Sequence, residues 1–462
     1  MKIKCDFLDR AEIQSIHEAS LEILSKVGVV FKHKDAIKVF KKHGARVEGN
    51  KVYIDKKLFQ TALSSIPKSF ILKGRTSDRD IEIGLNNTVV GTASGPVFIR
   101  EGNSRRLTTA EDFKNFTKLC ESSSVIEVMN GNMTEPQDII PEKRNKFRMA
   151  ASLKYSTKPL MGFTVGKSDA QDSIYMLQEF VESREKNLIM GIISVISPLT
   201  YDFGMLDAMF EYIKENQPLM FACCSLPGAT SPVTIAGTIA VNNAEVLAGI
   251  ILSQLIKPGF PVIYGNTTPS CDLRYVSPAI GSAETALITL VTASLGKFYG
   301  IPSRSGGSLT DSKIPDIQAG MESTLTILSP IMSGISFILQ SCGILESFNV
   351  LCYEKFVIDE QNIEIIKRYC SGFDINNDLL GKKAIEGIGP GGHFLQEIHT
   401  MKYFKKEHYI PRLSSKEGYD IWVNNKSKDM VFNAKQEVNK RLKEFEEIKI
   451  TKRQEKFISQ YM

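Results

Sequence analysis

Eight short apolar runs, separated by segments with helical spacing of apolar residues, dominate the middle of the chain. The runs cover 88–93, 125–129, 159–163, 188–194, 218–223, 260–264, 301–304 and 335–339. Continuous apolar runs of this length are typical of strands buried on both faces of a parallel sheet. The segments between them predict helices at 108–122, 142–155, 168–183, 201–215, 235–256, 282–296 and 315–333. This alternation predicts an α/β fold, a closed (β/α)8 TIM barrel.

A doubly wound open sheet is the competing interpretation. It is less favoured because eight units suffice to close a barrel and no glycine-rich dinucleotide fingerprint follows an early run. We expect the barrel to occupy 88–371, with a helical N-terminal segment at 1–87 and a C-terminal loop and helical extension at 372–462. In that extension a narrow apolar stripe is predicted to pack on the barrel: Val431, Ala434, Val438, Leu442 and Phe445.

Charge and hydropathy exclude some classes of function. The net charge is only +5 over 462 residues, and the lysines are spread along the chain among acidic residues. Nucleic-acid binding would call for dense basic runs, so none is expected. No apolar run is long enough to span a bilayer, and the start of the chain, 1–6, is too polar for a signal peptide. We therefore expect a cytoplasmic protein without a membrane partner.

Cysteine and histidine are placed too sparsely for a metal site. The eight cysteines are scattered without a Cys-x-x-Cys pair, and the six histidines include no His-x-x-x-His pair. Zinc and iron sites usually draw on such clusters. The sequence therefore predicts no protein-bound metal, and most cysteines are expected to be small buried hydrophobes.

Polar residues with functional potential gather where the predicted strands end. In a TIM barrel these ends share one face, and that face carries the chemistry. The strand ends carry amides, hydroxyls and small residues, among them Asn130, Asn266 and Gln340, but no histidine. Glu346 is the carboxylate that follows the last strand. Aromatic residues lie near the same ends: Phe98, Phe163, Tyr201, Phe221, Tyr264, Phe348 and Tyr353.

Aromatic and weakly polar walls suit an organic cation. A methylated ammonium group is held by the faces of aromatic rings and by one or two carboxylates. The alternative is that these aromatic residues are ordinary barrel core. For each aromatic residue taken singly that alternative is the stronger, whereas the set taken together adds weight to a cation pocket without establishing it.

The chain also resembles the trimethylamine/glycine betaine corrinoid methyltransferase superfamily. The matching segments span nearly the whole chain in order: Ile16-His-Glu-Ala-Ser-Leu-Glu-Ile-Leu-Ser-Lys-Val-Gly-Val29, Leu309-Thr-Asp-Ser-Lys-Ile-Pro-Asp-Ile-Gln-Ala-Gly320, Gly343-Ile-Leu-Glu-Ser347, Tyr353-Glu-Lys-Phe-Val-Ile-Asp359 and Gly389-Pro-Gly-Gly-His-Phe-Leu395. The resemblance implies a TIM barrel that moves a methyl group from a methylated amine to the Co(I) corrinoid, cob(I)alamin, of a separate corrinoid protein. The trimethylamine branch carries pyrrolysine, whereas this chain contains only the standard residues. It is thus similar to the non-pyrrolysine branch, which takes quaternary amines such as glycine betaine, proline betaine and carnitine.

Such a reaction demands little acid–base chemistry. Cob(I)alamin is a strong nucleophile, and a quaternary ammonium leaves as a neutral tertiary amine, so no proton has to be delivered. The protein needs a dry pocket that aims one methyl group at cobalt. A strand-end face without histidine is compatible with that task.

Roles for individual residues follow from their places in the chain. Glu346 is predicted to be the electrostatic partner of the ammonium; an ion pair with a neighbouring basic residue is the equal alternative. Asn130, Asn266 and Gln340 are predicted to orient the substrate, and Tyr264, Phe348 and Tyr353 to form the aromatic box. The positions predicted to let the corrinoid approach are Gly306, Gly307, Gly391, Gly392 and His393, although His393 taken alone is better explained as a structural residue.

Three other functions remain open at this stage. One is a non-catalytic betaine-binding barrel protein, and another is a tertiary methylamine:corrinoid methyltransferase. A barrel lyase would need a lysine or a metal site at a strand end, and neither is evident. We also expect a homo-oligomer.

Overall fold

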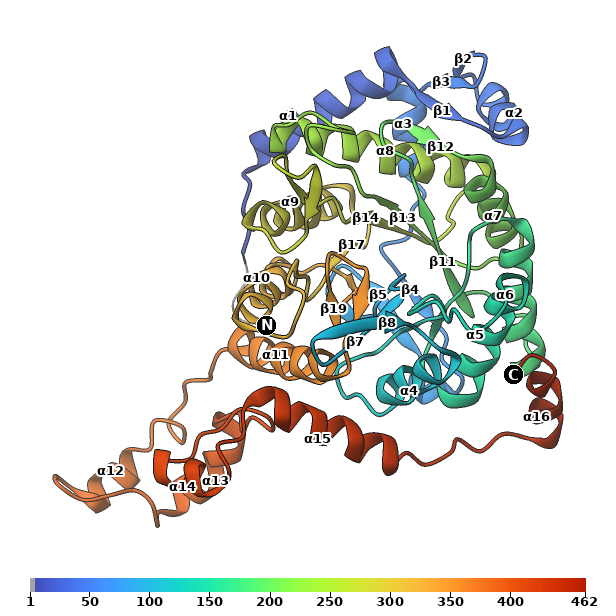
Figure 1. Cartoon of the computed structure of the whole chain (residues 1–462). Coiled ribbons are helices and arrows are strands. Elements are labelled where there is room, and N and C mark those ends of the chain that lie inside the picture. Colours follow the sequence, from blue (N-terminus) through green and yellow to red (C-terminus); the bar gives the residue numbers. More distant parts are fainter. Residues whose placement is uncertain (1–4) are drawn as a thin grey trace.

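A closed barrel of parallel strands forms the centre of the molecule (Figure 1). The computed structural model describes residues 5–462. The strands follow one another around the sheet in the order β6 (Val89–Val90), β18 (Phe337–Leu339), β17 (Ser303–Gly306), β14 (Val262–Asn266), β13 (Leu219–Cys223), β11 (Ile189–Ser194), β10 (Leu160–Met161) and β9 (Met129–Asn130). A parallel bridge between Gly91 and Val128 joins the two ends of the sheet. The predicted TIM barrel and its eight strands are confirmed, and the open sheet is excluded.

Helices between the strands form the outer layer. They are α4 (Ala110–Glu121), α5 (Pro141–Tyr155), α6 (Lys167–Val181), α7 (Phe203–Lys214), α8 (Ile235–Ile256), α9 (Ala283–Tyr299), α10 (Ile317–Ser333) and, after the last strand, α11 (Tyr353–Ser371). Helix α8 has the length and apolarity of a membrane span, but 78% of its most apolar window is buried in the protein. A buried central helix explains that composition.

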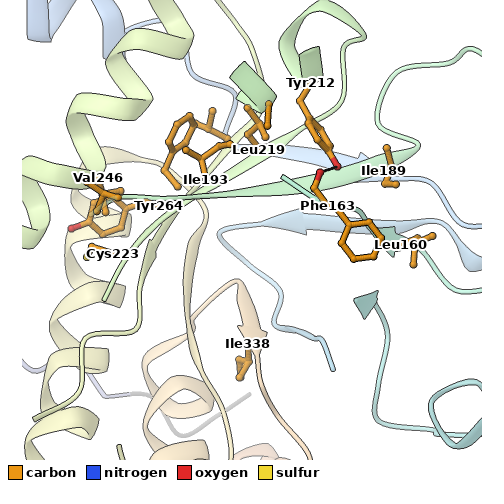
Figure 2. Packing of buried hydrophobic residues seen from close by; sticks show 14 of the residues in the cluster. Leu160, Phe163, Ile189, Ile193, Tyr212, Leu219, Cys223, Val246, Tyr264 and Ile338 are labelled. Carbon is orange, nitrogen blue, oxygen red and sulfur yellow. Dashed lines mark hydrogen bonds between the residues drawn. The ribbon is translucent and has the colours of Figure 1, made fainter. Parts of the chain in front are cut away.

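Strand side chains alternate between the barrel interior and the helix layer. Met190, Met220 and Ile263 belong to the cluster that fills the interior. Their neighbours in sequence, such as Leu219, face the helix layer, and Tyr264 lies beside Val246 of α8 (Figure 2). This is the period of two that a strand imposes on its side chains.

A hairpin closes the amino-terminal end of the barrel. It consists of β4 (Ser69–Leu72) and β5 (Ile81–Gly84), with the short 3-10 turn Ser77–Arg79 between them. Phe70, Leu72 and Ile83 from the hairpin join the interior cluster. Side chains of the hairpin therefore fill the barrel interior at its amino-terminal end.

The N-terminal segment packs on the outside of α8. It contains α1 (Arg10–Glu22), a π-helical turn at Ile23–Val27, α2 (Lys34–Lys42) and α3 (Lys56–Leu63). A small sheet joins β1 (Val29–Phe31), β2 (Arg46–Glu48) and β3 (Lys51–Tyr53) to β12 (Thr200–Tyr201). Asp9 and Asp55 cap α1 and α3 by accepting bonds from backbone N–H groups, as is typical of aspartate at a helix start.

Two further pieces border the carboxyl end of the barrel. β7 (Phe98–Glu101) and β8 (Ser104–Leu107) form a hairpin that continues into β20 (Val350–Leu351) and β19 (Ile344–Leu345). β15 (Ser270–Asp272) and β16 (Ser277–Ala279) form a separate hairpin directly after β14. Both lie in loops that follow barrel strands.

The C-terminal extension begins with a lobe that projects from the barrel (Figure 1). This C-terminal lobe holds α12 (Lys382–Ile388), α13 (Ile398–Glu407) and α14 (Tyr419–Asn424), and none of these helices buries a side chain. The chain then returns along the barrel as α15 (Met430–Lys443) and α16 (Lys452–Ser459). Ala434 and Val438 of α15 are buried, as predicted for the apolar stripe.

Candidate functional site

A pocket opens at the carboxyl end of the barrel, where the sequence predicts the site. Its volume is about 320 Å³, which is suitable for a small organic ligand. Every barrel strand, or the loop directly after it, contributes to the wall. The residues used below to describe this mouth pocket are Asn130, Phe163, Cys224, Arg304, Gln340 and Phe348.

Small side chains in the upper layer of the barrel create this space. Ala222 and Gly265 lie opposite each other on adjacent strands, just above the methionine layer. Gly265 is also paired with Arg304 on the next strand. A Cβ atom at Gly265 would lie 3.3 Å from Cδ of Arg304 and 2.7 Å from the carbonyl oxygen of Phe221. Glycine at this position therefore leaves room for the arginine side chain.

Arg304 is the charged residue of the mouth pocket. Its side chain is almost fully buried, at 2% exposure. One contact to protein involves its guanidinium, from Nη2 to Oε1 of Gln340 at 3.5 Å, and Nε has no partner among the described residues. Burial lowers the pKa of Arg304 to about 10, so the group still carries its proton at neutral pH.

Two thiols lie beside this arginine and remain neutral. Burial raises the pKa of Cys223 well above its ordinary value, and burial also raises the pKa of Cys224. Cys224 opens onto the mouth pocket, and its thiol points to the carbonyl of Thr267 at 3.6 Å. Neither thiol therefore supplies a negative charge for Arg304 at neutral pH.

A second buried arginine braces the opposite wall. Nη1 of Arg148 donates to Oδ1 of Asn132 at 2.5 Å, and its guanidinium carbon lies 4.5 Å from the centre of the Phe163 ring. Asn132 in turn donates its backbone N–H to Oδ1 of Asn130 at 2.8 Å. The Nδ2 group of Asn130 has no partner within residues 5–462 and is left free to donate to a ligand.

Among residues 5–462, no aspartate or glutamate lines the mouth pocket. Glu346 lies in the nearby loop between β19 and β20, where its carboxylate forms an ion pair with Arg105. It is mostly buried there, at 14% exposure. The structure thus shows the ion pair that the sequence left as the alternative for Glu346. Phe348, two residues further on, does reach the pocket wall.

Three of the predicted substrate residues come together and three do not. Asn130, Gln340 and Phe348 share the wall of the mouth pocket. Tyr264 faces the helix layer and donates its hydroxyl to Oδ1 of Asn243 at 2.9 Å. Asn266 turns to Asn242, with Nδ2 and Oδ1 3.4 Å apart.

Tyr353 is the third residue outside the pocket wall. Its hydroxyl donates to Oδ1 of Asp112 at 2.9 Å, and its ring stacks on Phe116 with centroids 4.1 Å apart. Arg106 pairs with the same Asp112 carboxylate. These contacts join α11 to α4 and give Tyr353 a structural task.

The predicted corrinoid-approach glycines lie in two separate places. Gly306 ends β17, and Gly307 packs so closely on Ser341 that a Cβ atom would lie 2.7 Å from its Cα. Gly391, Gly392 and His393 lie on the exposed loop between α12 and α13, in the C-terminal lobe. The two groups are not brought together around the mouth pocket.

Sequence reasoning missed Arg304 as a site residue. The signal was present, because a charged residue within a predicted strand that is buried on both faces has to serve a purpose. No metal-binding group of three or more ligating side chains occurs in the described part of the chain.

The fold and the mouth pocket define a TIM-barrel protein with a pocket of small-molecule size at the ends of its strands. The chain belongs to the trimethylamine methyltransferase (MTTB) family, whose profile matches residues 2–462. This finding confirms the resemblance described from the sequence. A glycine betaine methyltransferase of Desulfitobacterium hafniense (strain Y51) is 40% identical over 92% of this chain and 89% of its own length.

Other relatives carry related names. A proline betaine:corrinoid methyltransferase of Eubacterium limosum is 32% identical over 99% of this chain and 97% of its own length. A trimethylamine methyltransferase of Desulfitobacterium hafniense (strain DSM 10664 / DCB-2) is 28% identical over 92% of this chain and 87% of its own length. The similarity to betaine enzymes agrees with the predicted non-pyrrolysine branch.

Solved structures support the fold. The monomethylamine methyltransferase of Methanosarcina barkeri superposes with a TM-score of 0.58 and 12% identity. The match covers 96% of this chain and 88% of that chain. At this identity the likeness concerns the architecture alone.

Proposed function

We propose that the protein is a methyltransferase that transfers a methyl group from a quaternary amine to the Co(I) corrinoid of a separate corrinoid protein. The observation that carries the proposal is a closed barrel of this family with a small pocket at its strand ends. Phe163 and Phe348 supply aromatic surface in that pocket, and Asn130 and Gln340 supply amides. This composition suits a ligand that the protein has to orient but does not have to protonate.

The reaction balances without an acid from the protein. The corrinoid cobalt attacks one methyl carbon, and the carbon–nitrogen bond breaks. Its electron pair leaves on nitrogen as a neutral tertiary amine, while Co(I) becomes methyl-Co(III). The residues of the mouth pocket would hold the amine, exclude water and aim one methyl group outward.

The rim around the mouth pocket offers a docking face for the corrinoid protein. Large apolar side chains are exposed on the loops after the strands: Val165, Ile196, Val233, Leu273, Tyr275 and Val276. Val165 also lines the pocket. Exposed apolar groups gathered on one face are characteristic of an interaction surface. Docking here would bring the cobalt over the bound methyl group.

A second apolar surface supports a homo-oligomer. On α10, Ile317 is 82% and Met321 70% exposed, whereas Leu328 and Met332 further along the helix pack on the core. A hollow of about 430 Å³ lies beside α10, between α11 and α15. We assign this surface to a second copy of the chain. If so, Met321→Lys should lower the mass measured by sedimentation; an unchanged mass would remove the assignment.

A spectroscopic assay tests the proposed activity. The purified protein, a corrinoid protein with its cobalt reduced to Co(I) and each of several quaternary amines are mixed, and the conversion to methyl-Co(III) is followed. We expect conversion with at least one quaternary amine and none with trimethylamine. A flat trace with every amine, together with calorimetric binding of a betaine, would instead identify a non-catalytic binding protein. Conversion with trimethylamine alone would favour the tertiary methylamine alternative.

A further inference from the structure

The mouth pocket holds a positive charge that the protein does not neutralise. Arg304 is buried, its Nε has no partner in the described part of the chain, and the contact from Nη2 to Gln340 is long at 3.5 Å. Among the described residues no carboxylate lies in the pocket wall, and both neighbouring thiols are protonated. A guanidinium has five N–H donors, so most of its hydrogen-bonding capacity remains open.

Such an arrangement is costly in the empty protein. An uncompensated buried charge costs several kcal/mol, so proteins pair buried arginine with an anion wherever one is available. Elsewhere in this chain a buried guanidinium is paired with a carboxylate, as Arg441 is with Glu360, or donates to side-chain amide oxygens, as Arg148 does to Asn132 and Asn145. Arg304 has neither a carboxylate nor a short hydrogen bond among the described residues, which indicates that its anion arrives with the ligand.

The pocket also fits poorly with a ligand that is only a cation. A simple quaternary ammonium would meet the charge of Arg304 without a carboxylate in the wall to offset it. A zwitterion removes this conflict, because its anionic group can pair with Arg304 while its ammonium lies elsewhere. Planar guanidinium and carboxylate groups match in two parallel hydrogen bonds, which makes a carboxylate the best anionic partner.

We propose that Arg304 binds the carboxylate of the substrate and thereby restricts the enzyme to quaternary amines that carry a carboxylate. The inference rests on the proposed function for the identity of the ligand as a quaternary amine. Arg304 is buried on the strand floor of the pocket, whereas Phe348 is half-buried in a loop at its edge. The carboxylate is thus held deep, and the ammonium lies toward the opening with its methyl groups facing the incoming cobalt.

Three ligands with the same trimethylammonium group isolate the contribution of the carboxylate. They are glycine betaine, its neutral amide and choline, and their binding is measured by calorimetry without any corrinoid protein. The unmodified protein should bind glycine betaine at least about 100-fold more tightly than the amide or choline, which is the size of effect expected for a buried charge-assisted pair. Equal affinity for the three ligands would overturn the proposal.

Two variants test the residue. Arg304→Met should remove the preference for glycine betaine over its amide. Gln340→Glu serves as the second variant because it changes one atom and gives Arg304 a carboxylate of its own. We expect this variant to remain at least as heat-stable as the unmodified protein, yet to lose glycine betaine affinity by a similar factor. Unchanged affinity in Gln340→Glu would show that Arg304 is only structural.

A matched control and a second readout separate the possible failures. Arg441→Met removes another buried guanidinium outside the pocket wall and should leave the affinity for glycine betaine unchanged in folded protein. Preference for the carboxylate without methyl transfer to Co(I) would support Arg304 and contradict the proposed function. Methyl transfer from choline as fast as from glycine betaine would contradict the inference and leave the proposed function intact.

Discussion

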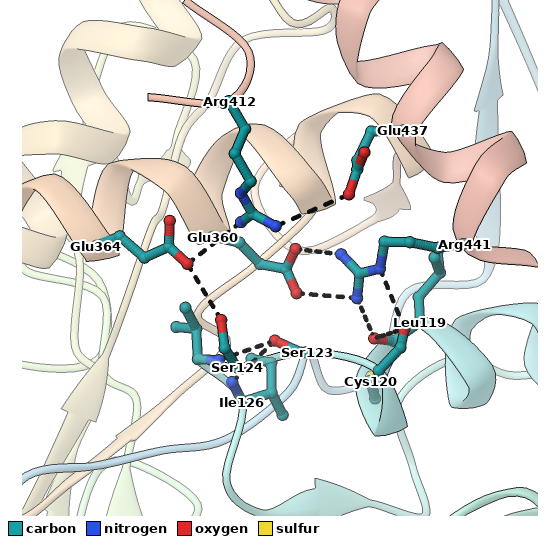
Figure 3. Close-up of polar contacts among 12 residues, drawn as sticks. Leu119, Cys120, Ser123, Ser124, Ile126, Glu360, Glu364, Arg412, Glu437 and Arg441 are labelled. Atoms are coloured by element: carbon teal, nitrogen blue, oxygen red, sulfur yellow. Dashed lines mark hydrogen bonds and ion pairs between the residues drawn. The ribbon is translucent and has the colours of Figure 1, made fainter. Parts of the chain in front are cut away.

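Arg441 of α15 forms a buried ion pair with Glu360 of α11, and its Nη2 lies 3.3 Å from Oε1 (Figure 3). The same guanidinium donates to the carbonyl of Leu119 and, through Nε, to the hydroxyl of Ser122 at 3.0 Å. One side chain thus joins the returning C-terminal helix to two helices of the barrel. The contact explains how α15 is held although its apolar stripe is narrow.

Replacing Arg441 should therefore be strongly destabilising. Arg441→Met leaves the carboxylate of Glu360 buried without a partner, and we expect a loss of about 3–5 kcal/mol in the free energy of unfolding. Denaturant unfolding followed by circular dichroism measures it. Arg412 is the matched control, because it pairs with Glu364 at 3.2 Å but is 44% exposed, so Arg412→Met should cost less than about 1 kcal/mol. Equal costs would contradict the role assigned to Arg441.

The barrel could be predicted well because the sequence patterns that indicate strands and helices are local. All eight strands and the helices between them follow from apolar runs and helical spacing, which depend on neighbouring residues. The helix caps at Asp9 and Asp55 are equally local features, since a cap acts within three residues. The C-terminal stripe was found for the same reason.

The site was harder to predict because successive residues of a strand point alternately into the barrel and toward the helix layer. Tyr264 and Gly265 are adjacent at a strand end, yet only Gly265 shares the interior with Arg304. If the assignment of inward and outward positions along a strand is wrong by one residue, every side chain is placed on the wrong face. This is why Tyr264 was predicted to contact the substrate. Tyr353 and Glu346 depend on partners more than 200 residues away, Asp112 and Arg105, and no local pattern reveals such pairs.

Glu245 should make the stability of the fold depend on pH. It is buried in α8, accepts bonds from Ser197 at 2.9 Å and from the N–H of Leu199 at 2.8 Å, and forms no ion pair within residues 5–462. Burial raises the pKa of Glu245 above its ordinary 4.5. The folded state then binds this proton more tightly than the unfolded chain, so the contribution to stability is greatest below pH 4.5 and falls as the pH rises through the folded pKa.

The melting temperatures of the unmodified protein and of Glu245→Gln, measured between pH 5 and 8, check this expectation. Glutamine keeps the shape and one acceptor oxygen but cannot ionise. The melting temperature of the variant should rise relative to that of the unmodified protein as the pH rises. A difference in melting temperature that stays constant, or that shrinks toward pH 8, would show that Glu245 is ionised in the fold at little cost.

Phe348 and Tyr353 were both predicted to form the aromatic box, but only Phe348 belongs to the wall of the observed pocket. Phe348→Ala removes aromatic surface from the pocket wall and should weaken binding of the substrate ammonium roughly tenfold, with little change in stability. Tyr353→Phe removes only the hydroxyl that donates to Asp112, so it should cost about 1 kcal/mol of stability and leave binding unchanged. Calorimetry and thermal unfolding measure both effects. The reverse result would return Tyr353 to the substrate site.

The exposed rim provides the last prediction, which concerns docking of the corrinoid protein. Leu273 lies between β15 and β16 and is 53% exposed, with its side chain beside Gly228 of the neighbouring loop. Leu273→Asp should lower the rate of methyl transfer at least about tenfold at limiting corrinoid protein, because a charge would be buried in the interface. Amine affinity should not change. Ile71→Asp is the control, since Ile71 is similarly exposed at 49% but lies on β4 at the closed end of the barrel. If both variants slowed the reaction equally, the strand-end rim would not be the docking face.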